Sequence, residues 1–260
     1  MVTAQEEATG TAGLRDGDGA PSVAERILLT LEACAAGNRS LTLAQLVDET
    51  GLAKTTLHRT CWKLVDLGLL EHGEDGFSIG LKMFALGNAN PLLNQLRVAA
   101  MPILLELQRS TGGMSNLAIL HDGKALIIDA LYAPQPAIPR LVGASLPLHS
   151  TAVGKAIAAT FAGDRLDELF AERPLLPAVT WRTIIQPTRL REHLAQVADK
   201  GIATSDEEFM MGVCGVAAAV RVRSDQTVAI GYVGPCNLRA IGRASEPVRE
   251  AAIELQEALA

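Results

Sequence analysis

The chain has 260 residues, of which 48% are apolar and 20% are charged, and its formal net charge at pH 7 is −6. This length permits one large domain or two ordinary ones, and the apolar content is sufficient for a substantial core. No run of about 18 uncharged apolar residues could span a bilayer, and the four cysteines lack the spacing of a zinc site or a disulfide framework. We therefore expect a soluble, cytoplasmic protein that holds no metal and no cofactor.

Residues 1–20 are rich in Gly, Ala, Thr, Asp and Glu. They have neither the basic start nor the apolar centre of an export signal. Because they contain so few large apolar side chains, they cannot bury enough surface to fold by themselves. We expect a disordered tail.

A first helix is predicted directly after Thr42. Thr42 and Gln45 have the spacing of a capping box, in which the Thr hydroxyl accepts a backbone N–H and the Gln side chain reaches back to the cap. The apolar face of this helix is formed by Leu43, Leu46 and Val47. Gly51 can adopt the left-handed conformation common at helix ends, so we expect the helix to end there.

A second helix is predicted from Ala53. Its apolar residues recur at the i, i+4, i+7, i+8 spacing of a buried stripe, and they are Leu57, Cys61, Leu64 and Val65. The opposite face carries short donors and cations, namely Lys54, Thr55, His58, Arg59 and Lys63. A DNA recognition helix requires this division, with an apolar seam toward its domain and polar groups toward the major groove.

A hairpin is predicted after the second helix. Residues 69–72 and 77–79 flank the turn 73–76, and Asp75 followed by Gly76 is a strong hairpin signal. Two helices and a two-stranded wing in this order predict a winged helix-turn-helix domain. The alternative is a helical packing module whose charges are simply solvated.

The exposed face of the second helix suggests individual DNA contacts. Arg59 and Lys63 suit phosphate groups, whereas Thr55, Thr56 and His58 suit base edges near the start of the helix. Residues 21–90 contain six basic and eight acidic residues. Residues 53–65, in contrast, contain the three cations Lys54, Arg59 and Lys63 and no carboxylate. One such surface would bind DNA weakly, which favours a dimer that presents two of them to a two-part site.

Residues 91–109 form the next predicted helix. Apolar residues at helical spacing are Leu92, Leu93, Leu96, Ala100, Ile103, Leu104 and Leu107. Pro102 is expected to kink or divide the helix, because proline lacks the N–H and crowds the preceding turn. Two roles fit this segment equally: simple packing against the second half, or transmission of ligand occupancy as a linker helix.

Beyond Ser110 the pattern changes from helices to strands. Strands are predicted over residues 116–120, 125–129, 216–222 and 227–233, and an Asp-Gly turn separates the first two. Helices are predicted after His149 and over residues 166–171, 188–200 and 245–259. This mixture predicts an α+β domain with an antiparallel sheet.

Both halves of the chain resemble the IclR family of bacterial transcriptional regulators. The first half resembles the DNA-binding domain of the family over residues 41–87, most specifically in residues 50–59 and 77–87. The second half resembles the linker in residues 97–102 and 111–112, an effector-domain helix in 147–155, a pocket loop in 201–208 and 212–213, and the last core strand in 229–235. The resemblance covers residues 22–258, with the motifs in the right order.

The resemblance implies a domain organisation and a set of partners. It implies a disordered tail at 1–20, a winged helix-turn-helix domain at 21–88, a linker helix at 89–109 and a GAF-like effector-binding and oligomerisation domain at 110–260. The partners would be double-stranded operator DNA, a small-molecule effector and further copies of the chain in a homodimer or tetramer. No membrane partner is implied.

The resemblance also implies where the effector lies. Its pocket maps onto Ala152, Val153, Ser205, Gly215, Gly231 and Val233. Relatives that bind small polar acids carry Asp, Cys and Ser at the last four of these positions, so the smaller and less polar residues here should give a larger, more apolar cavity. We therefore expect an aromatic or otherwise apolar carboxylic acid.

The carboxylate of such an acid would suit the helix that starts near His149. Ser150, Thr151 and free backbone N–H groups lie there, and helix starts attract anions. The alternative is that Ser150 and Thr151 only cap the helix.

Two other functions were weighed against DNA-dependent regulation. An enzyme would use Cys214 as nucleophile and His149 or His193 as base, beside Asp206 and Glu207, but no cysteine motif ties these residues together. We therefore expect no catalytic residue. A small-molecule sensor or scaffold that acts through protein partners, without DNA binding, is the second alternative. The sequence favours a ligand-responsive transcriptional regulator, and we expect a repressor.

Overall fold

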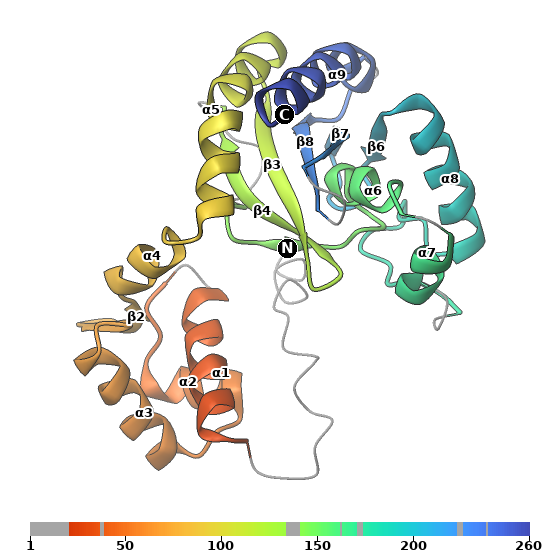
Figure 1. The fold of residues 1–260 in the computed structure, drawn as a ribbon. Helices are drawn as coiled ribbons and strands as arrows, with labels where there is room; N and C mark the ends of the chain where they lie inside the picture. The colour runs from red at the N-terminus through yellow and green to blue at the C-terminus, as the bar shows by residue number, and fades with distance from the viewer. Residues whose placement is uncertain are drawn as a thin grey trace. The chain divides into compact units, whose positions relative to one another are not determined.

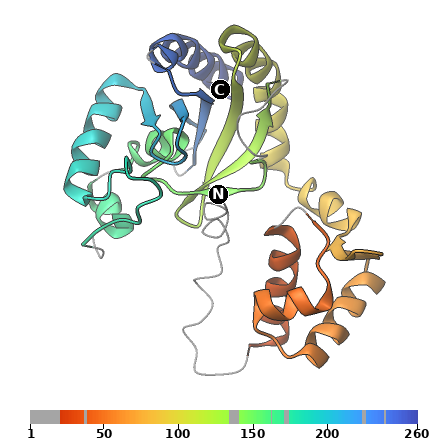
Figure 2. The same ribbon diagram turned by 180° about the vertical axis from the view of Figure 1, so that it is seen from behind.

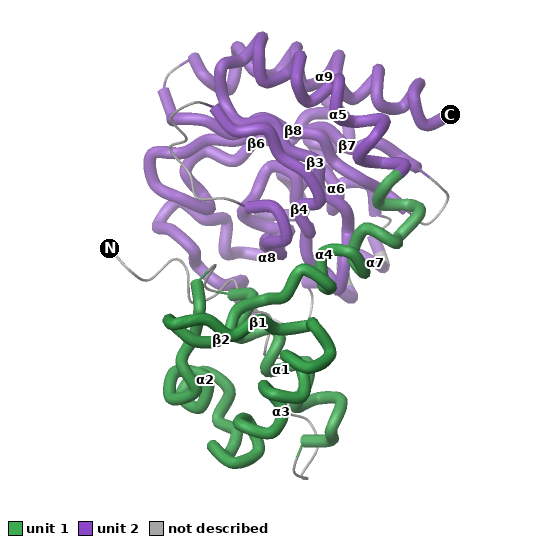
Figure 3. Tube along the Cα trace, turned by 90° about the vertical axis from the view of Figure 1, so that its left-hand side faces the viewer, with its two compact units in different colours: residues 1–94 green, residues 95–260 purple. Residues whose placement is uncertain are grey.

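The computed structural model describes residues 21–36, 39–133, 141–161, 163–170, 174–222, 226–237 and 239–260. The chain separates into two compact units, and the boundary falls between Asn94 and Gln95 (Figure 3). The predicted tail, residues 1–20, lies outside the described residues. Within the described part of the chain, no helix has the length and apolar character needed to cross a membrane.

The first unit is built from helices and one small hairpin (Figure 1). In chain order its elements are α1 (Val23–Ala36), α2 (Leu43–Thr50), α3 (Lys54–Asp66), β1 (Leu70–Gly73), β2 (Gly76–Ile79) and α4 (Leu81–Gly87). Its core contains Leu46 of α2, the Leu57, Cys61 and Leu64 stripe of α3, and Phe77 of β2. The predicted apolar seam of α3 is therefore buried.

The local signals at both ends of α2 act as predicted. Gln45 Oε1 accepts a hydrogen bond from Thr42 N at 2.9 Å, and Thr42 Oγ1 accepts one from Gln45 N at 3.3 Å, which completes the capping box. Gly51 ends the helix with a φ of 67° in the left-handed region. These two devices fix the length of α2 and the turn that leads into α3.

Helices α1 and α4 were not predicted from the sequence. Helix α1 begins at a second capping box, in which Ser22 N donates to Glu25 Oε2 at 2.6 Å and Glu25 N donates to Ser22 Oγ at 3.3 Å. It buries Thr30 and Cys34. The Ser-x-x-Glu spacing was a usable signal for α1, whereas α4 has only seven residues and buries none of them.

The second unit is an antiparallel sheet with helices on both faces. Its strands are β3 (Met114–His121), β4 (Lys124–Leu131), β5 (Ser145–Leu146), β6 (Ala203–Asp206), β7 (Val213–Arg221) and β8 (Thr227–Pro235). Its helices are α5 (Pro91–Thr111), which begins in the first unit, α6 (Ala152–Ala158), α7 (Gly163–Phe170), α8 (Pro187–Lys200) and α9 (Ala240–Ala258). The strand order is β5-β4-β3-β8-β7-β6, and every neighbouring pair is antiparallel.

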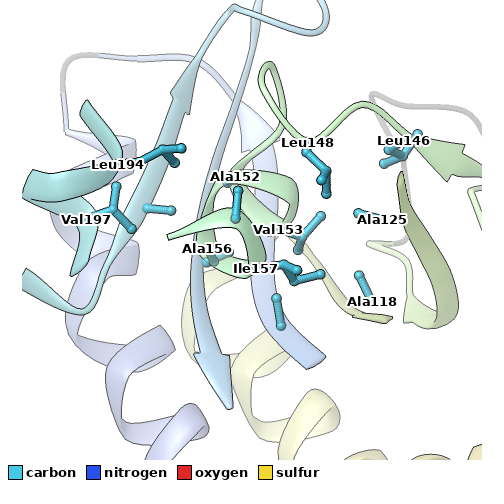
Figure 4. Packing of buried hydrophobic residues seen from close by; sticks show 14 of the residues in the cluster. Ala118, Ala125, Leu146, Leu148, Ala152, Val153, Ala156, Ile157, Leu194 and Val197 are labelled. Carbon is cyan, nitrogen blue, oxygen red and sulfur yellow. The ribbon is translucent and has the colours of Figure 1, made fainter. Parts of the chain in front are cut away.

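Two residues of β3 that lie three positions apart identify the faces of this sheet, because successive strand residues point to opposite sides. Ser115 Oγ donates to Leu104 O of α5 at 2.7 Å, so α5 lies on one face. Ala118 belongs to the core around α6, which lies on the other face with α8 (Figure 4). Helix α9 packs against β7 and β8 beside α5, away from α6 (Figures 1 and 2).

Apolar side chains pack against α6 from two sides. Figure 4 shows Val153 and Ile157 of α6 on the side of Ala118, and Leu194 and Val197 of α8 on the opposite side. Helix α6 contacts β3, β4, β6, β7, β8 and α8, so it lies at the centre of the unit. Any cavity at the start of α6 is therefore bordered by several strands.

The architecture confirms the predicted fold class, an N-terminal winged helix-turn-helix unit followed by an α+β unit with an antiparallel sheet. Pro102 was expected to kink or divide the helix, and it does not divide it, because α5 runs unbroken over Pro91–Thr111. Pro102 is exposed, which lets the chain lose one intrahelical hydrogen bond on the solvent side.

Candidate functional site

The exposed face of α3 is the first candidate site. Lys54, Thr55, His58, Arg59 and Lys63 are exposed, and Thr56 is half-buried. Among the described residues none of the three cations forms an ion pair. The structure therefore presents these side chains together to solvent, opposite the buried stripe of α3, as a positive surface without an internal counter-charge.

Trp62 connects α3 to the hairpin. Its ring centroid lies 4.9 Å from that of His72 in β1 and 5.8 Å from that of Phe77 in β2, the latter in an edge-on arrangement. Its side chain is 40% exposed, so one edge remains in solvent. Trp62 therefore packs against the wing.

Gly76 fixes the wing to the chain before α2. A Cβ atom at this position would lie 2.3 Å from Leu41 O, and the φ of Gly76 is +118°. Leu41 N donates to Phe77 O at 2.8 Å and Phe77 N donates to Leu41 O at 2.9 Å, so a short third strand segment pairs with β2. The close approach requires glycine, which makes Gly76 a structural determinant of the wing.

The second candidate site is a pocket at the start of α6. It contains about 540 Å³ of empty space, part of which opens to solvent. The wall comes from β3, β5, β6, β7, β8, the start of α6, the chain before β5 and the loop between β6 and β7. The lining residues are Asn116, Leu141, Leu146, Thr151, Ala152, Val153, Ser205, Phe209, Met210, Val213, Cys214, Gly215, Tyr232 and Val233.

The structure brings six of the eight predicted effector residues to this wall: Thr151, Ala152, Val153, Ser205, Gly215 and Val233. Ser150 is fully buried behind it, and its backbone O accepts the Ser205 hydroxyl at 2.8 Å. Gly231 lies within the sheet, where a Cβ would meet Val216 O at 2.9 Å. These two predicted residues do not line the pocket.

The hydroxyl groups at the pocket wall are used within the protein. Thr151 Oγ1 donates to Pro147 O at 2.8 Å and accepts from Gly154 N at 3.1 Å, so Thr151 caps α6. The Ser205 hydroxyl donates to Ser150 O. The capping alternative therefore describes Thr151, and the wall offers a ligand mostly apolar contacts.

Eight of the lining residues were not predicted as site residues. Leu141, Leu146, Phe209, Met210 and Val213 supply apolar surface, and Asn116, Cys214 and Tyr232 complete the wall. One signal was available for Asn116, because it is a polar residue in a predicted strand that otherwise contains apolar residues. The remaining residues carried no signal, since their position depends on strand order.

The loop between β6 and β7, residues 207–212, forms one side of the pocket and is held from two directions. Arg182 bridges Asp206 at 2.8 Å and Glu207 at 2.9 Å. Glu207 has a positive φ of 57°, and its Oε1 accepts from Gly212 N at 2.8 Å, which closes the loop. The buried Lys155 of α6 reaches Glu208 and Thr204 O. We call residues 207–212 the pocket loop.

Of the residues of the enzyme alternative, Cys214 is paired with Asp206 across β6 and β7. Cys214 Sγ lies 3.9 Å from Pro235 O and in hydrogen-bonding contact with Cys236, whereas His149 Nε2 contacts Pro177 O at 2.9 Å. Burial raises the pKa of the Cys214 thiol, which disfavours the nucleophilic thiolate. In the part of the chain that the structure describes, no cluster of His, Cys, Asp and Glu could hold a metal ion.

Comparison with protein families matches both units. Residues 23–74 match the IclR helix-turn-helix domain, and residues 93–256 match the bacterial transcriptional regulator IclR C-terminal domain. The first match covers α1, α2, α3 and β1, and the second covers the sheet and every residue that lines the pocket.

Individual proteins and structures agree with these matches. The chain is 34% identical over 81% of its length to the glycerol operon regulatory protein of Streptomyces griseus, covering 84% of that protein. It is 30% identical over 82% of its length to the acetate operon repressor of Salmonella typhimurium strain LT2, covering 79% of that protein. The crystal structure of an IclR homolog from Microbacterium hydrocarbonoxydans, complexed with 4-hydroxybenzoate, superposes with a TM-score of 0.80 at 25% identity, covering 90% of this chain and 97% of that one.

Proposed function

The chain belongs to the IclR family of bacterial transcriptional regulators, and we propose that it is a repressor whose binding to operator DNA is controlled by a small molecule. On binding an aromatic or otherwise apolar carboxylic acid, the protein would leave the operator or change its arrangement on it. The DNA would be bound by α3 and the wing, and the acid by the pocket at the start of α6. Such a regulator works in the cytoplasm, where the chromosome lies.

The observation that carries the DNA-binding part is the exposed face of α3. Three cations lie on one helix face with no carboxylate between residues 53 and 65, in a chain whose net charge is −6. Because the positive charges gather on this face while the rest of the chain is acidic, the face can attract phosphate groups locally. We propose phosphate contacts for Lys54, Arg59 and Lys63, and base contacts for Thr55, Thr56 and His58.

Two observations support the proposed effector class. The pocket wall is dominated by apolar side chains such as Leu141, Leu146 and Phe209, which suits a ligand with an apolar body. A structure that resembles this chain over 90% of its length contains 4-hydroxybenzoate, an aromatic acid. We propose that the ligand contacts Ala152, Val153, Gly215 and Val233, and that the predicted residues Ser150 and Gly231 support the pocket from behind.

We propose that α5 couples the pocket to DNA binding. Arg97 of α5 forms an ion pair with the buried Asp129 of β4 at 3.1 Å, so α5 is attached to the sheet that carries the pocket. A ligand can shift the population of DNA-binding arrangements only if it binds one arrangement better. The proposed division is a DNA-binding domain at 21–88, a linker at 89–109 and an effector domain at 110–260, in a homodimer or tetramer.

The experiment that tests this function is a fluorescence-anisotropy titration of the full chain. The labelled duplex would come from upstream of its own gene, with a scrambled duplex of equal composition as the control, at two salt concentrations. The regulator proposal predicts tighter, salt-sensitive binding to the upstream duplex and a change on adding benzoate-type acids.

The same titration also tests the alternative function. Equal or absent binding to both duplexes, with and without aromatic acids, would favour a small-molecule sensor or scaffold that acts through protein partners. Binding that discriminates between duplexes but ignores every acid would retain the regulator and reject the effector class.

A further inference from the structure

Asn116 is a polar side chain buried in an apolar pocket wall. It lies in β3, it is 1% exposed, and it lines the pocket at the start of α6. Its Oδ1 is buried and has no hydrogen-bond partner in the described part of the chain. Buried acceptors without a partner are rare and destabilise the folded state, so each one needs a reason.

The hydroxyl groups of Thr151 and Ser205 and the thiol of Cys214, which line the pocket, are committed elsewhere. The Thr151 hydroxyl donates to Pro147 O, the Ser205 hydroxyl donates to Ser150 O, and the Cys214 thiol is directed at Pro235 O. The described pocket wall therefore has no side-chain hydroxyl or thiol hydrogen left for the amide oxygen.

The Tyr232 phenol also points elsewhere. Tyr232 pairs with Ser115 in the sheet, and Ser115 faces α5 rather than the pocket. Its ring lies against Gly113 and Gly234, where added Cβ atoms would come within 2.2 Å of it. Tyr232 borders the pocket through β8, and its hydroxyl is on the other side of the sheet.

The sheet leaves room for the amide of Asn116. Gly231 is its partner in β8, and a Cβ at Gly231 would lie 3.2 Å from Asn116 Oδ1. That contact is tighter than nearly all contacts made by real Cβ atoms. The same Cβ would lie 2.9 Å from Val216 O, so the glycine is required by the packing of β7 against β8 as well as by the amide of Asn116.

We propose that Asn116 determines the specificity of the pocket by accepting a hydrogen bond from a hydroxyl group on the ligand. This inference rests on the proposed effector function of the pocket. An ammonium group would also donate, but no carboxylate lines the described wall to balance its charge. A carboxylate has no hydrogen to donate, so the ligand group at Asn116 is neutral and distinct from the acid group.

The test compares ligands that differ only in this donor. Isothermal titration calorimetry of the full chain would use benzoate, 4-fluorobenzoate, 3-hydroxybenzoate and 4-hydroxybenzoate, together with phenol and fluorobenzene. We expect at least one hydroxybenzoate to bind about ten-fold more tightly than benzoate and 4-fluorobenzoate, because only the hydroxyl satisfies Asn116.

A variant then assigns the preference to Asn116. Asn116→Leu keeps the size of the side chain and removes the amide, so it should abolish the preference while 4-fluorobenzoate affinity changes by less than about three-fold. It should also raise the thermal midpoint of the ligand-free protein, which a purely structural asparagine would not do. Ser115→Ala is the matched control, because Ser115 is the neighbouring polar residue on the other face of β3.

The outcomes separate this inference from the proposed function. Equal binding of hydroxy and fluoro compounds by the natural chain overturns the role of Asn116, and so does a preference that survives in Asn116→Leu or, if that variant fails to fold, in Asn116→Ala. If no benzoate binds but phenol exceeds fluorobenzene through Asn116, the inference stands and the acid class fails. If no compound binds, both are rejected.

Discussion

Lys155 of α6 and Glu208 of the pocket loop form a buried ion pair, with 2.5 Å between Lys155 Nζ and Glu208 Oε1. The Lys155 side chain is fully buried and that of Glu208 is 9% exposed. Burial lowers the pKa of Lys155, whereas the charge and hydrogen bond of Glu208 raise it. The pair joins the helix that begins at the pocket to the loop that borders it.

Removing the lysine from this pair should strongly destabilise the second unit. Lys155→Met leaves the Glu208 carboxylate buried without a partner, and such changes cost about 3–5 kcal/mol. Urea unfolding would measure the loss. The double variant Lys155→Met with Glu208→Leu removes both charges and should recover most of the stability; a double variant as unstable as the single one would contradict this assignment.

The wing should depend on Gly76. In Gly76→Ala the new Cβ would overlap Leu41 O and the residue would keep an unfavourable positive φ, so we expect a loss of more than about 2 kcal/mol in the first unit. Gly73→Ala in the same hairpin is the control, because its Cβ would meet no atom within 4 Å. The thermal midpoint and the DNA affinity should both fall in Gly76→Ala and change little in Gly73→Ala.

Arg59 should contribute to binding of all DNA sequences. Arg59→Ala removes one proposed phosphate contact, so affinity should fall similarly for the upstream and scrambled duplexes, and the slope of log affinity against log salt should flatten by about one per protomer. Arg109→Ala is the control, because it removes the same charge from an exposed position of α5 in the second unit. An unchanged salt slope in Arg59→Ala, or an equal change in Arg109→Ala, would reject the contact.

Gly215 should control the size of the pocket. An added Cβ would lie 3.2 Å from the Ala152 Cβ, so Gly215→Ala is tight and Gly215→Val projects further into the space for the ligand. We expect Gly215→Val to weaken binding of aromatic acids by roughly ten-fold or more. DNA binding without ligand should be unchanged. Ligand affinity equal to that of the natural chain in both variants would place the ligand elsewhere.

His193 should make the stability depend on pH. Burial, and then the positive charges of Lys155 and Lys200, lower its pKa from 6.5 to about 4. Between these values the unfolded chain binds a proton and the folded chain does not, so the free energy of unfolding decreases as the pH falls from 6.5 toward 4.

This pH dependence can be measured by urea unfolding at pH 7.5 and pH 5. We expect His193 to contribute a loss of roughly 1 kcal/mol at the lower pH, after allowance for solvent screening. His193→Gln should flatten the dependence, whereas His121→Gln, at an exposed position at the end of β3, should not. A His193→Gln variant with the natural slope would show that other groups cause the loss.

Some parts of the first unit were predictable because their signals are local. The capping box of Thr42 and Gln45, the left-handed Gly51 and the buried stripe from Leu57 to Leu64 each act within one or two helical turns. Helix α1 was missed although Ser22 and Glu25 give the same kind of signal. The continuity of α5 through Pro102 was not predictable, because it depends on which side of the helix faces solvent.

The pocket was predictable only in part. The start of α6, Ser205, Gly215 and Val233 were placed through resemblance to a family, and the structure puts them on one wall. Gly231 was placed on that wall by the same reasoning, yet it lies beneath Asn116 in the sheet. Gly231 and Val233 lie on the same face of β8, so strand alternation does not separate them; the Asn116 amide lies against Gly231, which depends on the tertiary structure.

The order of α2, the turn, α3 and the hairpin follows from the amino-acid sequence alone, because capping, helical periodicity and turn chemistry are short-range effects. The sequence also predicts that an antiparallel sheet follows. Only the tertiary structure decided the chemistry of the pocket. Strand order β4-β3-β8-β7 brings Asn116, Gly215 and Val233 together across more than a hundred residues of chain, and the buried amide oxygen of Asn116 has no hydrogen-bond partner among the described residues.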